Sequence, residues 1–148
     1  MFEDHHALVF RTAYRVIGNA ADAEDVLQTI FLRLLRRRQT DTVEDHESYL
    51  RRAAVNASLD LIRSRREAVE LVDLPSRAHE PDAGELRAAL RRALGRLSPR
   101  SAEIFTLRFF EGLSNQKIAR MLGMSRVSVA VVVHRARQQL RRDLRDYR

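Results

Sequence analysis

Apolar residues recur along most of the chain at the three- and four-residue spacing of amphipathic helices. The first such segment covers residues 2–17 and stops at Gly18-Asn19. Its expected apolar face consists of Ala7, Leu8, Phe10, Ala13, Tyr14 and Ile17. Asp22 is placed to cap a second helix, because its carboxylate can accept from a free backbone N–H. The residues expected to pack inward in this second helix are Val26, Leu27, Ile30, Phe31, Leu34 and Leu35.

A third helix is predicted from about His46 to Arg66. Its inward stripe is Leu50, Ala53, Ala54, Ala57 and Leu61. A second face carries Arg52, Asn56, Asp60 and Arg63 at helical spacing. A charged stripe of this kind is commonly a solvated surface, but the concentration of arginine here favours contact with phosphates.

The character of the sequence changes after the third helix. Residues 67–83 are acidic, contain two of the three prolines and lack a sustained apolar period, which is typical of a linker. A fourth helix is predicted from Glu85 to Leu97, with Leu86, Ala89, Leu90, Ala93 and Leu94 inward. Ser98-Pro99 then opens a fifth helix, with serine as the N-cap and proline at the first helical position.

The stretch from Glu111 to Arg142 predicts two helices joined by a tight turn. Ser114 is a good N-cap for the first, and Gly123 can adopt the left-handed conformation that ends it. Ser125 caps the second, whose apolar positions are Val129, Val133, Ala136 and Leu140. A short helix, a glycine-containing turn and a longer helix with a basic end form a helix-turn-helix pattern, which is typical of DNA readers.

These elements predict an all-α protein with two small helical domains, at residues 1–66 and 84–148, joined by the acidic linker 67–83. The chain has 148 residues, with 27 basic and 20 acidic side chains, a formal charge of +7 and a pI near 11.0. This excess favours a polyanionic partner such as nucleic acid. The first ten residues lack the basic start and apolar core of a signal peptide, no apolar run of about 18 residues occurs, and cysteine is absent, so we expect a cytoplasmic protein.

No catalytic constellation is recognisable in the sequence. Glycine-rich phosphate loops and the H-E-x-x-H and G-x-S-x-G motifs are absent. The five histidines do not have the spacing of metal ligands, and adjacent His5 and His6 would point in different directions on a helix. We therefore expect a protein that is not an enzyme and uses neither a metal nor a cofactor.

The motifs in the chain resemble those of bacterial sigma factors of the extracytoplasmic-function (ECF) type, over nearly the whole length. The D-A-E-D-x-x-Q-x-x-F pattern of the family's polymerase-binding helix is complete, as Asp22, Ala23, Glu24, Asp25, Gln28 and Phe31. The next helix, YLRRAAVNASLDLIRSRR, resembles the family's −10 element reader. The segment LSPRSAEIFTLRFFEGLSNQKIARMLGMSRVSVAVVVHRARQQLRR resembles its −35 element reader.

The resemblance implies a transcription initiation factor that binds core RNA polymerase and promoter DNA. Polymerase contacts are implied for Asp22, Glu24, Asp25, Gln28 and Phe31. Recognition and melting of the −10 element are implied for Arg52, Asn56, Arg63, Arg65 and Arg66, with a base pocket from roughly residues 40–47. Contacts with the −35 element are implied for Ser125, Arg126, Ser128, His134, Arg135 and Arg137. Base reading is expected at Arg126 and Ser128, and phosphate contact at Arg135 and Arg137.

The sequence departs from the family's pattern in the recognition helix. A lysine and an arginine that many relatives carry are Ala130 and Val132 here, and a tryptophan of the −10 reader is Tyr49. Val131 and Val132 are expected to be partly exposed. They either contact another part of the fold or make apolar contacts with thymine methyl groups. In both cases, recognition of the −35 element is expected to be weak or unusual.

Two alternatives remain open on the sequence. One is a sigma-like regulator that binds polymerase or DNA without supporting initiation. The other is a helical protein-interaction module whose basic faces are merely solvated, which predicts no salt-dependent affinity for DNA. The family resemblance also implies that the free domains can pack together, or be held by an anti-sigma factor, with their DNA-binding faces hidden.

Overall fold

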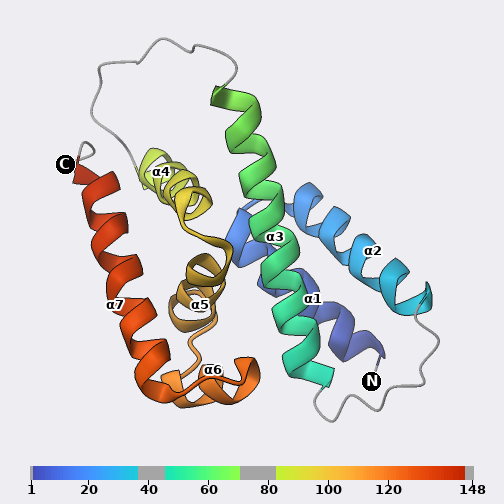
Figure 1. The fold of residues 1–148 in the computed structure, drawn as a ribbon. Helices are drawn as coiled ribbons and strands as arrows, with labels where there is room; N and C mark the ends of the chain where they lie inside the picture. The colour runs from blue at the N-terminus through green and yellow to red at the C-terminus, as the bar shows by residue number, and fades with distance from the viewer. Residues whose placement is uncertain (1, 37–45, 71–82, 146–148) are drawn as a thin grey trace.

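The computed structural model describes residues 2–36, 46–70 and 83–145, and within these ranges every secondary-structure element is a helix (Figure 1). The elements are α1 (Phe2–Ile17), α2 (Ala20–Arg36), α3 (His46–Glu70), α4 (Ala83–Arg96), α5 (Pro99–Phe109), α6 (Asn115–Leu122) and α7 (Arg126–Asp143). The predicted all-α class is therefore confirmed. Most of the predicted linker, and all but the last two positions of the expected base pocket at residues 40–47, lie outside the described residues.

The helix ends follow the local signals in the sequence. Ser98, Ser114 and Ser125 each accept a hydrogen bond from the backbone N–H three residues ahead, and Gly123 ends α6 with φ of 67°. The predicted N-cap of α2, Asp22, was wrong. Its N-cap is Asn19, whose side-chain oxygen accepts from the Asp22 N–H at 3.1 Å. The carboxylate of Asp22 does not cap the helix and accepts hydrogen bonds from Arg65 instead.

The first three helices share a core in which Val9, Leu27, Ile30, Leu50 and Ala54 are buried. Leu35 is not part of this core, because 78% of it is exposed, although we expected it to pack inward. At about 100° per residue, Leu35 lies roughly 130° from the middle of the face formed by Ala23, Val26, Leu27 and Ile30, whereas Leu34 stays near that face and packs against the core. The expected inward positions Ala7, Tyr14 and Leu86 are also exposed.

The long helix α3 lies at the centre of the structure, with α1 and α2 on one side and α4 and α5 on the other (Figure 1). Helices α4–α7 form a second core around Leu94, Ile104, Leu107 and Ile118. That core continues into the first half of the chain through Val16, Val55, Leu59 and Ile62. The two halves are therefore packed against each other along α3. None of the described helices is long and apolar enough to cross a membrane.

Candidate nucleic-acid interface

The polar face of α3 is directed at the second half of the chain. Arg52 Nε and Asn56 Nδ2 each donate to the same carboxylate oxygen of Glu103, both at 2.7 Å. Glu103 lies in α5, and only 5% of its side chain is exposed. A buried carboxylate needs such donors, because its charge is costly to remove from water without a partner. In this arrangement two residues predicted to read the −10 element are occupied by a protein side chain.

A second carboxylate, Glu111, joins the two halves just after α5. It accepts from Thr12 Oγ1 at 2.7 Å, from Arg15 Nη1 at 2.8 Å and from Arg51 Nη1 at 2.8 Å. Its side chain is 0% exposed. Burial alone would raise the pKa of Glu111, but the hydrogen bonds from Thr12 and Arg15 and the charges of Arg15 and Arg51 outweigh burial and lower that pKa. The carboxylate is therefore ionised at neutral pH.

We call this arrangement the carboxylate clamp. It consists of Glu103 and Glu111 from the second half and their donors Thr12, Arg15, Arg51, Arg52 and Asn56 from the first. Sequence reasoning missed both carboxylates. A signal was present for Glu103, which sits between Ala102 and Ile104 in a stretch that is buried throughout. A charged residue inside such a run requires a partner, although the sequence does not say which one.

The remaining residues predicted for the −10 element are distributed along the end of α3. Arg63 donates to Asp60, one turn earlier, at 2.9 Å. Arg65 makes a bidentate pair with Asp22 of α2, at 2.5 and 2.6 Å. The hydrogen bond from Arg65 lowers the pKa of Asp22, against the opposing effect of burial. The side chain of Arg66 lies outside the described residues.

The residues predicted to bind polymerase divide into two groups. Glu24, Asp25 and Gln28 are exposed on the first turns of α2, where the helix dipole favours negative charge. Phe31 is half-buried and packs against the first core. Asp22 is buried by its pair with Arg65, so it does not share the open surface of the other polar members.

The helix-turn-helix is formed by α6 and α7, with the predicted caps in place. Ser125 is the N-cap of α7. Its Oγ accepts from the Ser128 N–H at 3.0 Å and donates to Ser128 Oγ at 2.8 Å, so the two predicted contact residues are bonded to each other. The longer side chains predicted to contact the −35 element are all exposed, namely Arg126, His134, Arg135 and Arg137. The Arg137 guanidinium also lies 5.4 Å from the centre of the Phe109 ring, which holds it at the helix surface.

The valines of α7 differ in their surroundings. Val129 and Val133 are buried, as predicted, and Val132 packs against the second core from a partly buried position. Val131 is 41% exposed and Val127 is 73% exposed. Contact with the rest of the fold therefore explains Val132 and leaves the other two on the open side of the helix.

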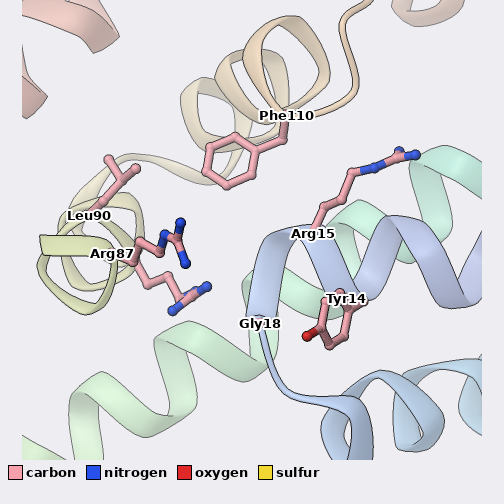
Figure 2. Close-up of a pocket in the computed structure, with 7 residues that line it drawn as sticks. Tyr14, Arg15, Gly18, Arg87, Leu90 and Phe110 are labelled. Atoms are coloured by element: carbon pink, nitrogen blue, oxygen red, sulfur yellow. The ribbon is translucent and has the colours of Figure 1, made fainter. Parts of the chain in front are cut away.

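A cavity of about 350 Å³ lies where the end of α1 meets α4 and the end of α5. Figure 2 shows Arg87 extending from α4 toward the end of α1, where Tyr14 and Gly18 lie. Arg91 also lines the cavity, and its Nε donates to the Val16 carbonyl of α1 at 3.1 Å. Burial, with the neighbouring charge of Arg87, lowers the pKa of Arg91. Gly18 has φ of 76° and leaves room for this guanidinium.

Comparison with known proteins adds independent evidence. Sigma-70 region 2 matches residues 1–68, and Sigma-70, region 4 matches residues 87–140. The chain is 35% identical, over 95% of its length, to the ECF RNA polymerase sigma factor SigE of Mycolicibacterium smegmatis, and it covers 59% of that protein. It is 35% identical, over 92% of its length, to the RNA polymerase sigma-E factor of Streptomyces coelicolor, and it covers 79% of that protein. With SigL of Mycobacterium tuberculosis it shares 30% identity over 99% of the chain and 88% of the relative.

Two solved structures share the fold. The sigma factor RpoE of Bartonella quintana, in complex with the anti-sigma factor NepR, aligns with a TM-score of 0.56 and 21% identity, over 97% of this chain and 94% of that one. The extracytoplasmic function sigma factor SigJ of M. tuberculosis aligns with a TM-score of 0.53 and 22% identity, over 95% of this chain and 53% of that one. The matched regions occur in order, and relatives covered over most of their length are 30% or more identical, so the chain belongs to the ECF-type RNA polymerase sigma factors.

Proposed function

We propose that this protein binds bacterial core RNA polymerase, directs it to promoters through −10 and −35 elements, and initiates transcription. The observation that carries the proposal is the helix-turn-helix of α6 and α7, whose solvent side holds exposed cations from Arg126 to Arg142. Cations in this arrangement suit a helix that enters the major groove between two phosphate backbones. The proposed binding to polymerase rests on membership of the sigma-factor family.

The proposed division of labour follows the two halves of the chain. Residues 1–66 would bind polymerase, through the open surface of Glu24, Asp25 and Gln28, and would read and melt the −10 element. Residues 84–148 would read the −35 element, and residues 67–83 would connect the two. Since the chain covers 59% of the SigE relative, these activities are proposed for this chain rather than transferred from the whole relative. We propose the cytoplasm as its location, because polymerase and DNA are found there.

The carboxylate clamp adds a condition to this function. Arg52 and Asn56 donate to Glu103 in the packed arrangement, so reading of the −10 element requires the two halves to separate. An anti-sigma factor is a natural partner for such a protein, and RpoE of B. quintana was solved with one. A free protein that is already extended in small-angle scattering would contradict control by packing.

The proposed function is tested by permanganate footprinting of thymines on a candidate promoter, with core polymerase and with or without this protein. Reactivity around the −10 element that appears only with the protein supports initiation. Binding to core polymerase without any opened thymine would instead favour the non-initiating regulator. Binding to neither polymerase nor DNA would contradict the proposal. Leu86→Ala, which shortens an exposed side chain on α4 outside the predicted contacts, serves as the matched control.

A further inference from the structure

Two valines, Val127 and Val131, are exposed within the first two turns of the recognition helix α7. Val127 and Val131 are four residues apart, so they lie one above the other on a helix. The buried side of α7 is formed by Val129, Val133 and Ala136. At about 100° per residue, Val127 and Val131 point in nearly the opposite direction. Their exposed fractions, 73% and 41%, agree with this geometry.

Among the described residues, neither Val127 nor Val131 belongs to the second core or packs against it. Helix α7 packs on α5, α6 and α4, and Val132 contributes to that packing. Exposed single apolar residues are common and need no explanation. Here, however, the pair occupies the N-terminal part of the second helix of a helix-turn-helix, which is the part that meets base edges in the major groove.

The surroundings of the pair favour DNA over an apolar protein surface. Arg126 precedes Val127, and His134 and Arg135 follow Val131 by three and four residues; all three are exposed. The result is an apolar strip bordered by cations. A major groove matches it, because the groove floor carries the methyl groups of thymine between two rows of phosphates.

The valine side chain limits which groups of the bases this strip can recognise. Its side chain has no hydrogen-bonding atom, so it cannot read the donors and acceptors of guanine, cytosine or adenine. The C5 methyl of thymine is the apolar group that a base pair presents in the major groove. We therefore propose that Val127 and Val131 read thymine methyl groups in the −35 element, an inference that rests on the proposed function.

This mode of reading has a measurable strength. Burying one methyl group changes affinity by about fourfold, which is less than a bidentate hydrogen-bonded contact provides. We expect the preferred −35 sequence to contain thymine at positions that face Val127 and Val131. We also expect replacement of such a thymine by deoxyuridine, which removes only the methyl group, to weaken binding about fourfold.

The test uses the full chain assembled with core polymerase. A promoter duplex with a randomised −35 region is first subjected to selection by the holoenzyme, which identifies the preferred bases. Affinity is then measured on duplexes with thymine or deoxyuridine at each selected position, for the wild type and for Val127→Ala and Val131→Ala. Leu86→Ala, which shortens an exposed apolar residue on α4, is the control variant. Transcription from an intact −10 element is recorded in the same samples.

We expect replacement of thymine by deoxyuridine to lower the affinity of the wild type and of Leu86→Ala about fourfold. In one of the valine variants the same replacement should have no effect. A selected −35 element without thymine, or equal deoxyuridine effects in all variants, would overturn the inference while transcription persists. Valine variants that lose polymerase affinity rather than base preference would assign the strip to a protein contact and would also overturn it. Absence of both transcription and promoter binding would instead contradict the proposed function itself.

Discussion

Replacing Glu103 with glutamine is expected to loosen the contact between the two halves of the chain. The variant keeps the size of the side chain and an acceptor oxygen, but it removes the negative charge that receives Arg52 and Asn56 at 2.7 Å. Both donors would become available more often. The affinity of the free protein for single-stranded −10 DNA is therefore expected to rise.

The size of the effect can be worked out from the contact. A hydrogen bond to a charged group contributes about 1.5–3 kcal/mol, and a neutral one about 0.5–1.5 kcal/mol. The difference is about 1–1.5 kcal/mol. It applies to the Asn56 contact, whereas the Arg52 contact keeps one charged partner and is screened by solvent, because the Arg52 side chain is 42% exposed. We therefore use the lower end, about 1 kcal/mol, which corresponds to a change of roughly fivefold in the ratio of packed to separated protein.

The ratio is measurable by single-molecule fluorescence energy transfer between the halves. The chain contains no cysteine, so two introduced cysteines accept dyes without further changes. Ala21 on α2 and Gln116 on α6 are exposed positions outside the clamp. The population with high transfer is expected to fall in Glu103→Gln, and to stay unchanged in Asp60→Asn, which alters an exposed carboxylate on α3 that faces Arg63.

Arg52→Ala distinguishes the two consequences of the contact. It leaves Glu103 buried with fewer partners, so it is expected to separate the halves at least as strongly as Glu103→Gln does. It also removes a proposed DNA contact, so its affinity for −10 DNA is expected to fall where that of Glu103→Gln rises. Equal transfer populations in the wild type and Glu103→Gln would refute the view that this carboxylate holds the halves together.

Three further predictions follow from other contacts of the structure. The pKa of Glu111 is lowered, so the contribution of Glu111 to packing is present above the ordinary pKa of 4.5 and is lost as the pH falls through the lower pKa of the folded protein. Energy transfer between the halves should therefore drop in that acid range. The Glu111→Gln variant should abolish this pH dependence. Asp22→Asn and Arg65→Ala are each expected to reduce the free energy of unfolding by about 1 kcal/mol. Because the two residues share one contact, urea unfolding of the double variant should show no larger reduction than either single variant. Additive reductions would show that the two residues act separately. Gly18→Ala places a Cβ 2.1 Å from Arg91 Nη2 at φ of 76°; it is expected to cost about 1–2 kcal/mol, mainly from backbone strain, and unchanged urea unfolding would argue against that conformation.

The fold could be predicted from the sequence to the extent that its signals are local. Ser98, Ser114 and Ser125 cap helices through contacts with residues three positions ahead, and Gly123 ends α6 through its own backbone. Such features depend on neighbours that the sequence displays directly. The prediction was wrong where two nearby residues could each cap the same helix. At the start of α2 the cap is Asn19 rather than Asp22.

The candidate site could be predicted only in part, because its residues acquire partners from distant positions. The sequence places Arg52 and Asn56 on one face of α3, and they do share one, since both reach the same oxygen. That oxygen belongs to Glu103, at separations of 51 and 47 residues, and no periodicity reports such a pairing. Similarly, Asp22 and Arg65 were assigned to different partners but are bound to each other. Whether these residues contact polymerase or DNA stays a prediction.

The positions of the two proposed DNA-reading surfaces relative to the clamp imply an order of engagement. Glu103 holds Arg52 Nε and Asn56 Nδ2 against the second half of the chain, so packing competes with −10 reading for these two side chains. The open side of α7 lies outside the clamp, and Val127 and Val131 are exposed while the halves are packed. A −35 element can therefore bind either state, whereas a −10 element selects the separated one. Because coupling is reciprocal, a partner that holds the halves apart strengthens −10 binding by the same factor by which −10 DNA strengthens that partner's binding.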